Sequence, residues 1–235
     1  MNRTSIFIKT CKKDLPWLNY CLRSVKSHAS GFHEVVIVLD EDCRGEEIFK
    51  ASESQFSYFV SSWENGYIQQ QHIKLHADKY CTGNLILFVD SDCVFMRAFS
   101  PESFLKDEKP ILLKTRYGNL DGAEAWKAIT ESFVGFPVEF EYMRRMPLIY
   151  KSSSISEFRY AHSGNISHLQ SMTDRAFSEF NAIGAWIDKV ASDQYFISDT
   201  ESWMPPVVAK QFWSWGGISE EIRVEMERYI EGHET

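Results

Sequence analysis

An uninterrupted apolar segment that ends in two carboxylates is the feature that most constrains the fold. Residues 85–89 read Leu-Ile-Leu-Phe-Val, and Asp90, Ser91 and Asp92 follow directly. A strand without polar interruptions suits a parallel sheet that helices cover on both faces. Ligands of open α/β sheets bind beyond the carboxyl ends of the strands, so the two aspartates are predicted at a binding edge.

The spacing of Asp90 and Asp92 predicts a cation site. In an extended segment, residues two apart point the same way, so one ion can contact both carboxylates directly or through water. Hard oxygen ligands suit Mg²⁺ or Mn²⁺. A polar turn after the strand is the alternative, since Asp and Ser are common in turns.

The order of apolar runs along the chain predicts an α/β fold. Strands are expected at residues 5–8, 35–39, 56–60 and 85–89, and helices around 15–25, at 67–80, 123–133 and 177–190, and after Ser219. Strand–helix–strand units favour a mostly parallel central sheet with right-handed crossovers and helices on both faces. No linker divides the chain, so residues 1–235 are predicted to form a single domain.

Composition argues against several classes of protein. The formal net charge of −8 gives no general basic footprint for nucleic acid. The five cysteines are odd in number and never form a C-x-x-C pair, which argues against a disulfide framework or a zinc site. No apolar run approaches the ~20 residues that span a bilayer, and the start lacks a signal-peptide segment. We therefore expect a cytoplasmic protein without a membrane span.

The predicted helix before the acidic strand has one unusual face. Its polar members are spaced at i, i+3, i+4 and i+7, and they are Tyr67, Gln70, Gln71 and Lys74. Two amides and a lysine suit the lining of a polar cleft. A solvent-exposed helix face would have the same kind of residues, so it is the alternative. His72 and His76 are also four apart, but without a third ligand they are interpreted as boundary residues.

Several ordered motifs resemble the GT-A glycosyltransferases. They are the helix segment at residues 66–75, the D-x-D strand at 87–92, and segments at 140–147 and 177–184. The pattern is most similar to a small bacterial and viral group with a G-[WY]-x-x-Q-Q-x-x-K-L helix before a D-x-D strand. The similarity spans roughly residues 5–217.

This resemblance implies a nucleotide-diphosphate sugar donor, and a UDP-sugar is expected. It makes residues 1–100 the nucleotide-binding half and 101–235 the acceptor half. A divalent cation, Mn²⁺ or Mg²⁺, would bridge Asp92 to the phosphates, and Asp90 would contact the ribose or the metal through water. The donor-binding residues expected on this basis are Thr10, Asp40, Gln70, Gln71, Lys74, Asp90 and Arg97.

The resemblance also suggests a general base and a lid. Glu179 is the expected base and Asp188 the reserve, although Glu179 also fits a first-turn glutamate that follows the cap Ser178. Related enzymes bring a late histidine to the metal, and here only His233 stands late in the chain. The lid or acceptor-side residues would be Trp213, Trp215, Gly216 and Gly217.

Two other functions stay open on the sequence alone. Nucleotidyl transfer normally uses a glycine-rich loop after the first strand, and residues 10–14 contain no glycine. The second open function is a non-catalytic module that binds a nucleotide-sugar. The acceptor is an unidentified hydroxyl compound, with a glycan or a hydroxymethylated DNA base among the candidates. DNA would need a basic and aromatic patch, whose expected members are Arg144, Arg145, Tyr150, Lys151, Phe158, Arg159 and Tyr160.

Overall fold

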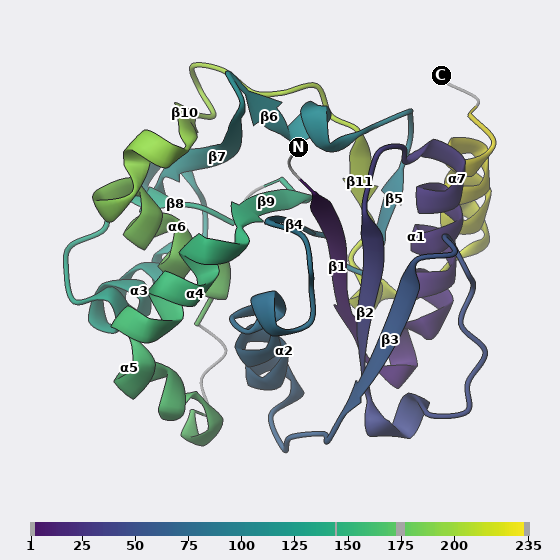
Figure 1. The fold of residues 1–235 in the computed structure, drawn as a ribbon, viewed down its shortest axis with the longest axis horizontal. Coiled ribbons are helices and arrows are strands. Elements are labelled where there is room, and N and C mark those ends of the chain that lie inside the picture. Colours follow the sequence, from purple (N-terminus) through teal and green to yellow (C-terminus); the bar gives the residue numbers. More distant parts are fainter. Residues whose placement is uncertain (1–2, 144, 173–176, 233–235) are drawn as a thin grey trace.

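A five-stranded sheet forms the centre of the computed structural model, which describes residues 3–143, 145–172 and 177–232 (Figure 1). Its strands, in spatial order, are β3 (Gln55–Val60), β2 (Glu34–Asp40), β1 (Thr4–Thr10), β4 (Leu85–Phe88) and β9 (Leu148–Lys151). The first four are parallel, and β9 is antiparallel to β4. The predicted α/β class with a mostly parallel sheet is confirmed. Strand order reverses between β1 and β4, which creates a ligand-binding switch point.

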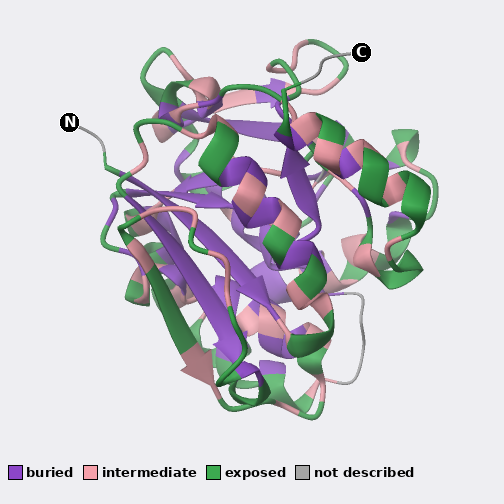
Figure 2. Cartoon of the chain, turned by 90° about the vertical axis from the view of Figure 1, so that its right-hand side faces the viewer, coloured by how far each residue is buried: buried purple, intermediate pink, exposed green. Residues whose placement is uncertain are grey.

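The two faces of the sheet are buried by different layers. In β1, Ile6 and Ile8 join the cluster that contains α1 (Leu15–His28), whereas Phe7 joins the cluster that contains α2 (Gly66–Lys74). This alternation follows from the period of a strand, whose successive side chains point to opposite faces. Figure 2 shows the central strands almost wholly buried, while the edge strand β3 is partly exposed.

The remaining helices complete both layers. They are α3 (Glu124–Val134), α4 (Ser152–Ala161), α5 (Ser163–Ser167), α6 (Glu179–Val190) and α7 (Glu220–Ile230). Helix α7 packs beside α1, and α3, α4 and α6 gather on the other side of the sheet (Figure 1). Among the described residues, no helix has the length and apolar character to cross a membrane.

Helix α2 is shorter than the predicted helix at 67–80. It ends at Lys74, and a separate 3₁₀ turn follows at Ala77–Lys79. A guanidinium from α4 occupies this break: Arg159 donates to the carbonyl oxygen of Leu75 at 3.0 Å and pairs with Asp78. A tertiary contact therefore ends the helix where local sequence would extend it.

Short strands outside the central sheet position the rest of the chain. One group joins β7 (Lys109–Arg116) to β10 (Phe196–Asp199), β6 (Leu105–Lys106) and β8 (Phe140–Glu141). The other pairs β5 (Cys93–Phe95) with β11 (Ala209–Gln211) in antiparallel register, so that Gln211 stands opposite Cys93. Because Cys93 directly follows the acidic pair, β11 carries a distant segment to the carboxyl edge of the central sheet.

We predict that Gly184→Ala destabilises the fold. A Cβ at Gly184 would lie 2.3 Å from Cβ of Tyr142, so the two elements would have to separate. Overpacking of this kind lowers the free energy of unfolding by about 1–3 kcal/mol. Gly164→Ala is the matched control, because its added Cβ meets no atom within 4 Å. Urea unfolding measures both, and an equal effect of the two substitutions would contradict the close packing.

Candidate active site

The two aspartates that follow β4 converge at the carboxyl edge of the sheet. The side-chain amide of Gln211 donates to both: its Nε2 lies 3.3 Å from Oδ2 of Asp90 and 3.2 Å from Oδ1 of Asp92. The backbone N–H of Ser214 donates to the other oxygen of Asp92 at 2.9 Å. Two carboxylates that share one donor have the arrangement that a shared cation needs.

The electrostatics at this point favour an added positive charge. Burial raises the pKa of Asp92 above its ordinary value, and the neighbouring charge of Asp90 raises it further. Hydrogen bonds from Ser214 and Gln211 lower the pKa of Asp92 and offset part of the rise. Neither donor is charged, so they do not cancel the repulsion between the two carboxylates.

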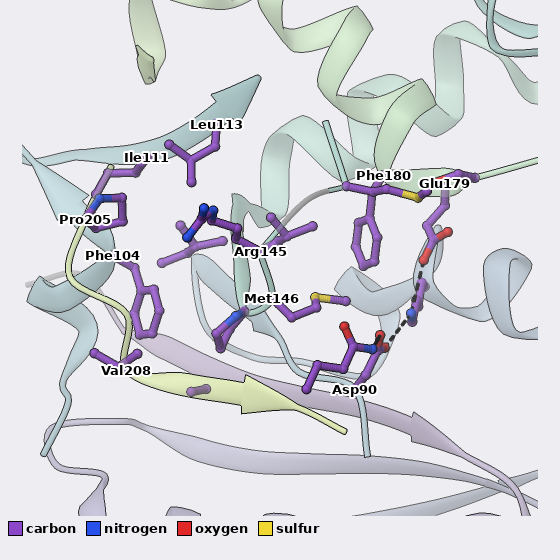
Figure 3. A pocket seen from close by; sticks show the side chains of 18 of the residues that line it. Asp90, Phe104, Ile111, Leu113, Arg145, Met146, Glu179, Phe180, Pro205 and Val208 are labelled. Atoms are coloured by element: carbon purple, nitrogen blue, oxygen red, sulfur yellow. Dashed lines mark hydrogen bonds and ion pairs between the residues drawn. The ribbon is translucent and has the colours of Figure 1, made fainter. Parts of the chain in front are cut away.

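A buried lysine joins Asp90 to a third carboxylate. Nζ of Lys74 lies 2.8 Å from Oδ1 of Asp90 and 3.2 Å from Oε1 of Glu179 (Figure 3). Lys74 is only 3% exposed, and burial alone would lower its pKa. The two carboxylates outweigh burial and raise the pKa of Lys74 instead. The lysine is therefore a permanent cation between the acidic strand end and α6.

The polar face of α2 meets α6 and an adjoining cavity rather than solvent. Oε1 of Gln71 accepts a hydrogen bond from the backbone N–H of Glu179 at 3.1 Å. The hydroxyl of Tyr67 donates to the carbonyl oxygen of Phe177 at 2.8 Å, and Gln70 lines the cavity. These contacts favour the polar-cleft interpretation of the helix.

Glu179 is both a first-turn residue of α6 and a lining residue of the cavity. Ser178 caps the helix, since its Oγ accepts from the N–H of Asn181 at 3.3 Å. Burial raises the pKa of Glu179; the charge of Lys74 opposes this rise, and that of Asp90 adds to it. A carboxylate with a raised pKa at a cavity wall is suited to accept a proton.

The cavity beside these residues has a volume of about 570 Å³. Its polar end is formed by Gln70, Lys74 and Asp90 from the first half of the chain and by Glu179 and Gln211 from the second half. Apolar residues from β7, α3 and the segment before β11 line much of the remaining wall. This volume falls in the range of small-molecule binding sites.

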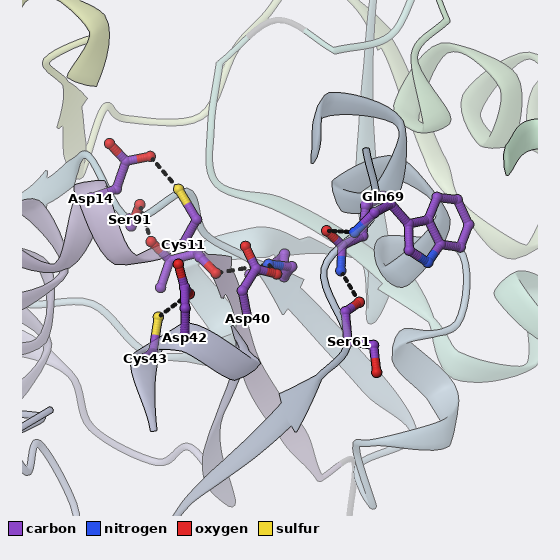
Figure 4. Close-up of polar contacts among 11 residues, drawn as sticks. Cys11, Asp14, Asp40, Asp42, Cys43, Ser61, Gln69 and Ser91 are labelled. Atoms are coloured by element: carbon purple, nitrogen blue, oxygen red, sulfur yellow. Dashed lines mark hydrogen bonds and ion pairs between the residues drawn. The ribbon is translucent and has the colours of Figure 1, made fainter. Parts of the chain in front are cut away.

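Two predicted donor residues lie at the same edge but outside the cavity. Oδ1 of Asp40 accepts from Nζ of Lys9 at 2.7 Å, and Oγ1 of Thr10 donates to Oγ of Ser91 at 3.1 Å (Figure 4). Lys9 was not predicted as part of this edge. A lysine directly after the apolar residues 6–8 of the strand was the available signal, because a buried lysine needs an acidic partner.

Asp188 and Arg97 lie away from the cavity wall that the described residues form. Oδ2 of Asp188 is 2.8 Å from Nζ of Lys114 and accepts from the hydroxyl of Tyr142 at 2.8 Å. Arg97 is exposed beyond β5. Neither side chain joins the group formed by Asp90, Lys74 and Glu179.

The predicted lid segment borders the site. Trp213 lines the cavity and is 58% exposed, while Trp215 is 85% exposed. Neither indole is therefore part of the buried aromatic core, which is the other place that a tryptophan commonly takes. Trp213 and Gly217 both have positive φ values, 59° and 72°, and Gly216 lies between them in a short 3₁₀ turn. The N–H of Ser214 ties this turn to Asp92.

Histidines add no metal ligand to the described part of the chain. Within residues 3–143, 145–172 and 177–232, no three or more His, Cys, Asp or Glu side chains form a metal-binding group. His72 and His76 stack with ring centroids 4.3 Å apart, beside Trp63. His233 lies outside the described residues.

The basic and aromatic patch considered for DNA is not formed. Tyr150, on β9, and Phe158, on α4, are fully buried residues of the same core cluster. Arg159 is bound to Asp78, and Nζ of Lys151 donates to Gln194 at 3.2 Å. The prediction that these residues form one surface patch was wrong. Among the described residues, its exposed members are Arg145 and Tyr160. Arg144 lies outside the described residues.

We expect Lys74→Met to destabilise the protein strongly. The substitution leaves the buried carboxylate of Glu179 without its cation, and breaking a buried pair costs about 3–5 kcal/mol of unfolding free energy. Adding Glu179→Gln should restore part of the loss by removing that charge. Lys114→Met is the control, since the Lys114–Asp188 pair is 21% exposed on each side and is expected to contribute about 1 kcal/mol or less. Chemical denaturation measures the free energy of unfolding of both variants. Equal losses for Lys74→Met and Lys114→Met would contradict the assignment of Lys74 as the cation that compensates the buried Glu179.

Comparison with known proteins places the chain in a family. The family described as Glycosyl transferase family 2 matches residues 5–166, which is more than half of the 235 residues. The match includes Lys74 and the aspartate pair but ends before Glu179 and β11. A search of curated proteins gives no match. The extent of the family match, together with the sheet and the acidic strand end, shows that the chain belongs to glycosyl transferase family 2.

Proposed function

We propose that the protein is a metal-dependent glycosyltransferase that moves a sugar from a UDP-sugar to a hydroxyl acceptor. The observation that carries the proposal is the convergence of Asp90 and Asp92 at the switch point, beside a cavity that leads to Glu179. Family membership supports glycosyl transfer over nucleotidyl transfer or binding alone. We also assign the chain to the bacterial and viral group with the same helix and D-x-D pattern.

The donor site in this proposal spans the carboxyl ends of β1, β2 and β4. Thr10 would lie near the base, Asp40 near the nucleoside and Asp90 near the ribose or the metal. The ammonium group of Lys74 is already bound by two carboxylates, so we assign it to positioning them rather than to binding phosphate. Residues 1–100 form the nucleotide half, and residues 101–235 form most of the acceptor wall.

The residues present fit a divalent cation. Asp90 and Asp92 offer hard oxygen atoms around one point, and their mutual repulsion needs a positive charge. These two carboxylates would hold Mn²⁺ or Mg²⁺, with water in the remaining positions. When bound, the ion supplies a Lewis acid that neutralises the charge of the leaving nucleotide diphosphate.

Glu179 is the proposed general base of an inverting transfer. The acceptor oxygen forms a bond to the anomeric carbon while the bond from that carbon to the diphosphate oxygen breaks. The hydroxyl proton passes to the carboxylate of Glu179, and the electron pair leaves with the nucleotide diphosphate. The burial of Glu179 at the cavity wall supports this role. Trp213, Trp215, Gly216 and Gly217 would cover the bound sugar.

We predict that Mn²⁺ raises the melting temperature in the presence of UDP and that Asp92→Asn abolishes this effect. Protons compete with the metal for Asp92, whose pKa is raised, so the shift should shrink as the pH falls from neutral. Without metal, the pH dependence of stability has the opposite sign. The folded state binds the proton on Asp92 more tightly than the unfolded chain does, so the free energy of unfolding falls as the pH rises through the same range. Differential scanning fluorimetry measures both, with the exposed Asp193→Asn as control. Equal Mn²⁺ shifts in wild type and Asp92→Asn would refute the metal site.

Glu179→Gln should slow transfer while donor binding is retained. Loss of a general base reduces turnover by about 10²- to 10⁴-fold. Release of UDP from a UDP-sugar, with water as the acceptor, measures the rate, and equilibrium titration measures donor affinity. Asp188→Asn serves as the comparison, because Asp188 is held by Lys114 and Tyr142 outside the cavity. If Asp188→Asn lost the activity and Glu179→Gln kept it, the two assignments would be exchanged.

A further inference from the structure

The cavity next to Glu179 has two chemically different ends. Asp90 and Glu179 lie on one side of Figure 3, whereas Phe104, Ile111 and Pro205 lie on the other. The carboxylates and Lys74 belong to the site already described. The opposite end lies in the proposed acceptor half of the chain, and it has no role in holding the donor.

The wall of this far end is almost entirely apolar. Its lining includes Phe104, Ile111, Leu113, Pro205 and Val208 (Figure 3). Such a surface offers few hydrogen-bond partners to a hydroxyl-rich ligand such as a glycan. A sugar placed here would lose its hydrogen bonds to water without replacement, and each polar group left unpaired opposes binding. An apolar ligand would instead gain from leaving water.

One cation stands beside this apolar wall. Arg145 lines the cavity next to Met146, its side chain extends toward Ile111 at the apolar end, and its backbone has a positive φ of 70° (Figure 3). The chain has 33 acidic residues, yet no carboxylate of the described residues pairs with this guanidinium. A guanidinium at a cavity wall that pairs with no carboxylate in the described part of the chain is suited to bind an anionic ligand group.

We propose that the acceptor is a small amphipathic molecule with an apolar body, a hydroxyl at one end and an anionic group at the other. The hydroxyl lies against Glu179, the body fills the apolar part of the cavity, and the anion pairs with Arg145. The proposal rests on the function assigned above, and it excludes glycans and duplex DNA as the acceptor. The volume of about 570 Å³ suits a free small molecule of this kind.

Three probes separate the contributions of charge and apolar body. They are 10-hydroxydecanoate, the uncharged 1,10-decanediol and the short acid 4-hydroxybutyrate, each titrated calorimetrically into the protein with Mn²⁺ and UDP. We expect the long hydroxy acid to bind most tightly, about fivefold tighter than the diol, because a charged hydrogen bond at a partly exposed site is worth about 1 kcal/mol. The short acid should bind more weakly than either long probe.

The substitution Arg145→Met tests the cation directly. It should remove the preference for the hydroxy acid over the diol and leave the affinity for the diol unchanged. Arg228→Met, at an exposed position on α7, is the matched control and should keep the preference. Equal binding of acid and diol to wild type, a preference that survives Arg145→Met, or failure of both long probes to bind would each overturn the proposal.

The same titrations distinguish failure of this proposal from failure of the assigned function. UDP binding that depends on Mn²⁺ is measured first, without any acceptor probe. If UDP binds and the long probes do not, the acceptor class is wrong and the glycosyltransferase assignment stands. If UDP does not bind with Mn²⁺, the donor assignment fails, and the acceptor proposal falls with it.

Discussion

The contact of Lys74 with Asp90 and Glu179 connects the parts of the chain on which the site depends. Lys74 ends α2, Asp90 follows β4, and Glu179 begins α6. Burial of a lone ammonium or carboxylate is unfavourable, so the three elements are stable together only in an arrangement that brings these charges into contact. The strand end and the helix that carries the proposed base therefore have a fixed separation before any ligand binds.

A second long-range contact fixes the other side of the acidic strand end. Strand β11 pairs with β5 and places the amide of Gln211 between Asp90 and Asp92. The turn after β11 donates the N–H of Ser214 to Asp92. Residues more than one hundred positions away thus orient both carboxylates, which explains why a short D-x-D motif alone says little about the geometry of a site.

Local sequence pattern predicts the centre of this fold well and its contacts less well. Unbroken apolar runs identify the middle of β1, β2 and β4, because the central residues of a strand buried on both faces are mostly apolar. The polar face of α2 is recognisable because Gln71 and Lys74 share a helical spacing. The early end of α2 and the burial of Tyr150 come from partners distant in sequence, among them Arg159, and no local pattern reveals them. For the same reason, no local sequence pattern predicts that Gln211 contacts Asp90 and Asp92.

The balance of charge at the site leads back to the cation. When Asp90, Asp92 and Glu179 are ionised, Lys74 compensates one of three negative charges. The nearby pair of Lys9 and Asp40 is neutral by itself and contributes nothing to the balance. Two negative charges are left at a partly buried edge. Burial raises the pKa values of Asp92 and Glu179, and the neighbouring charge of Asp90 raises them further. One divalent ion at the proposed site would carry the charge that compensates the two negative charges, so metal binding and the ionisation of the proposed base would be parts of one electrostatic system.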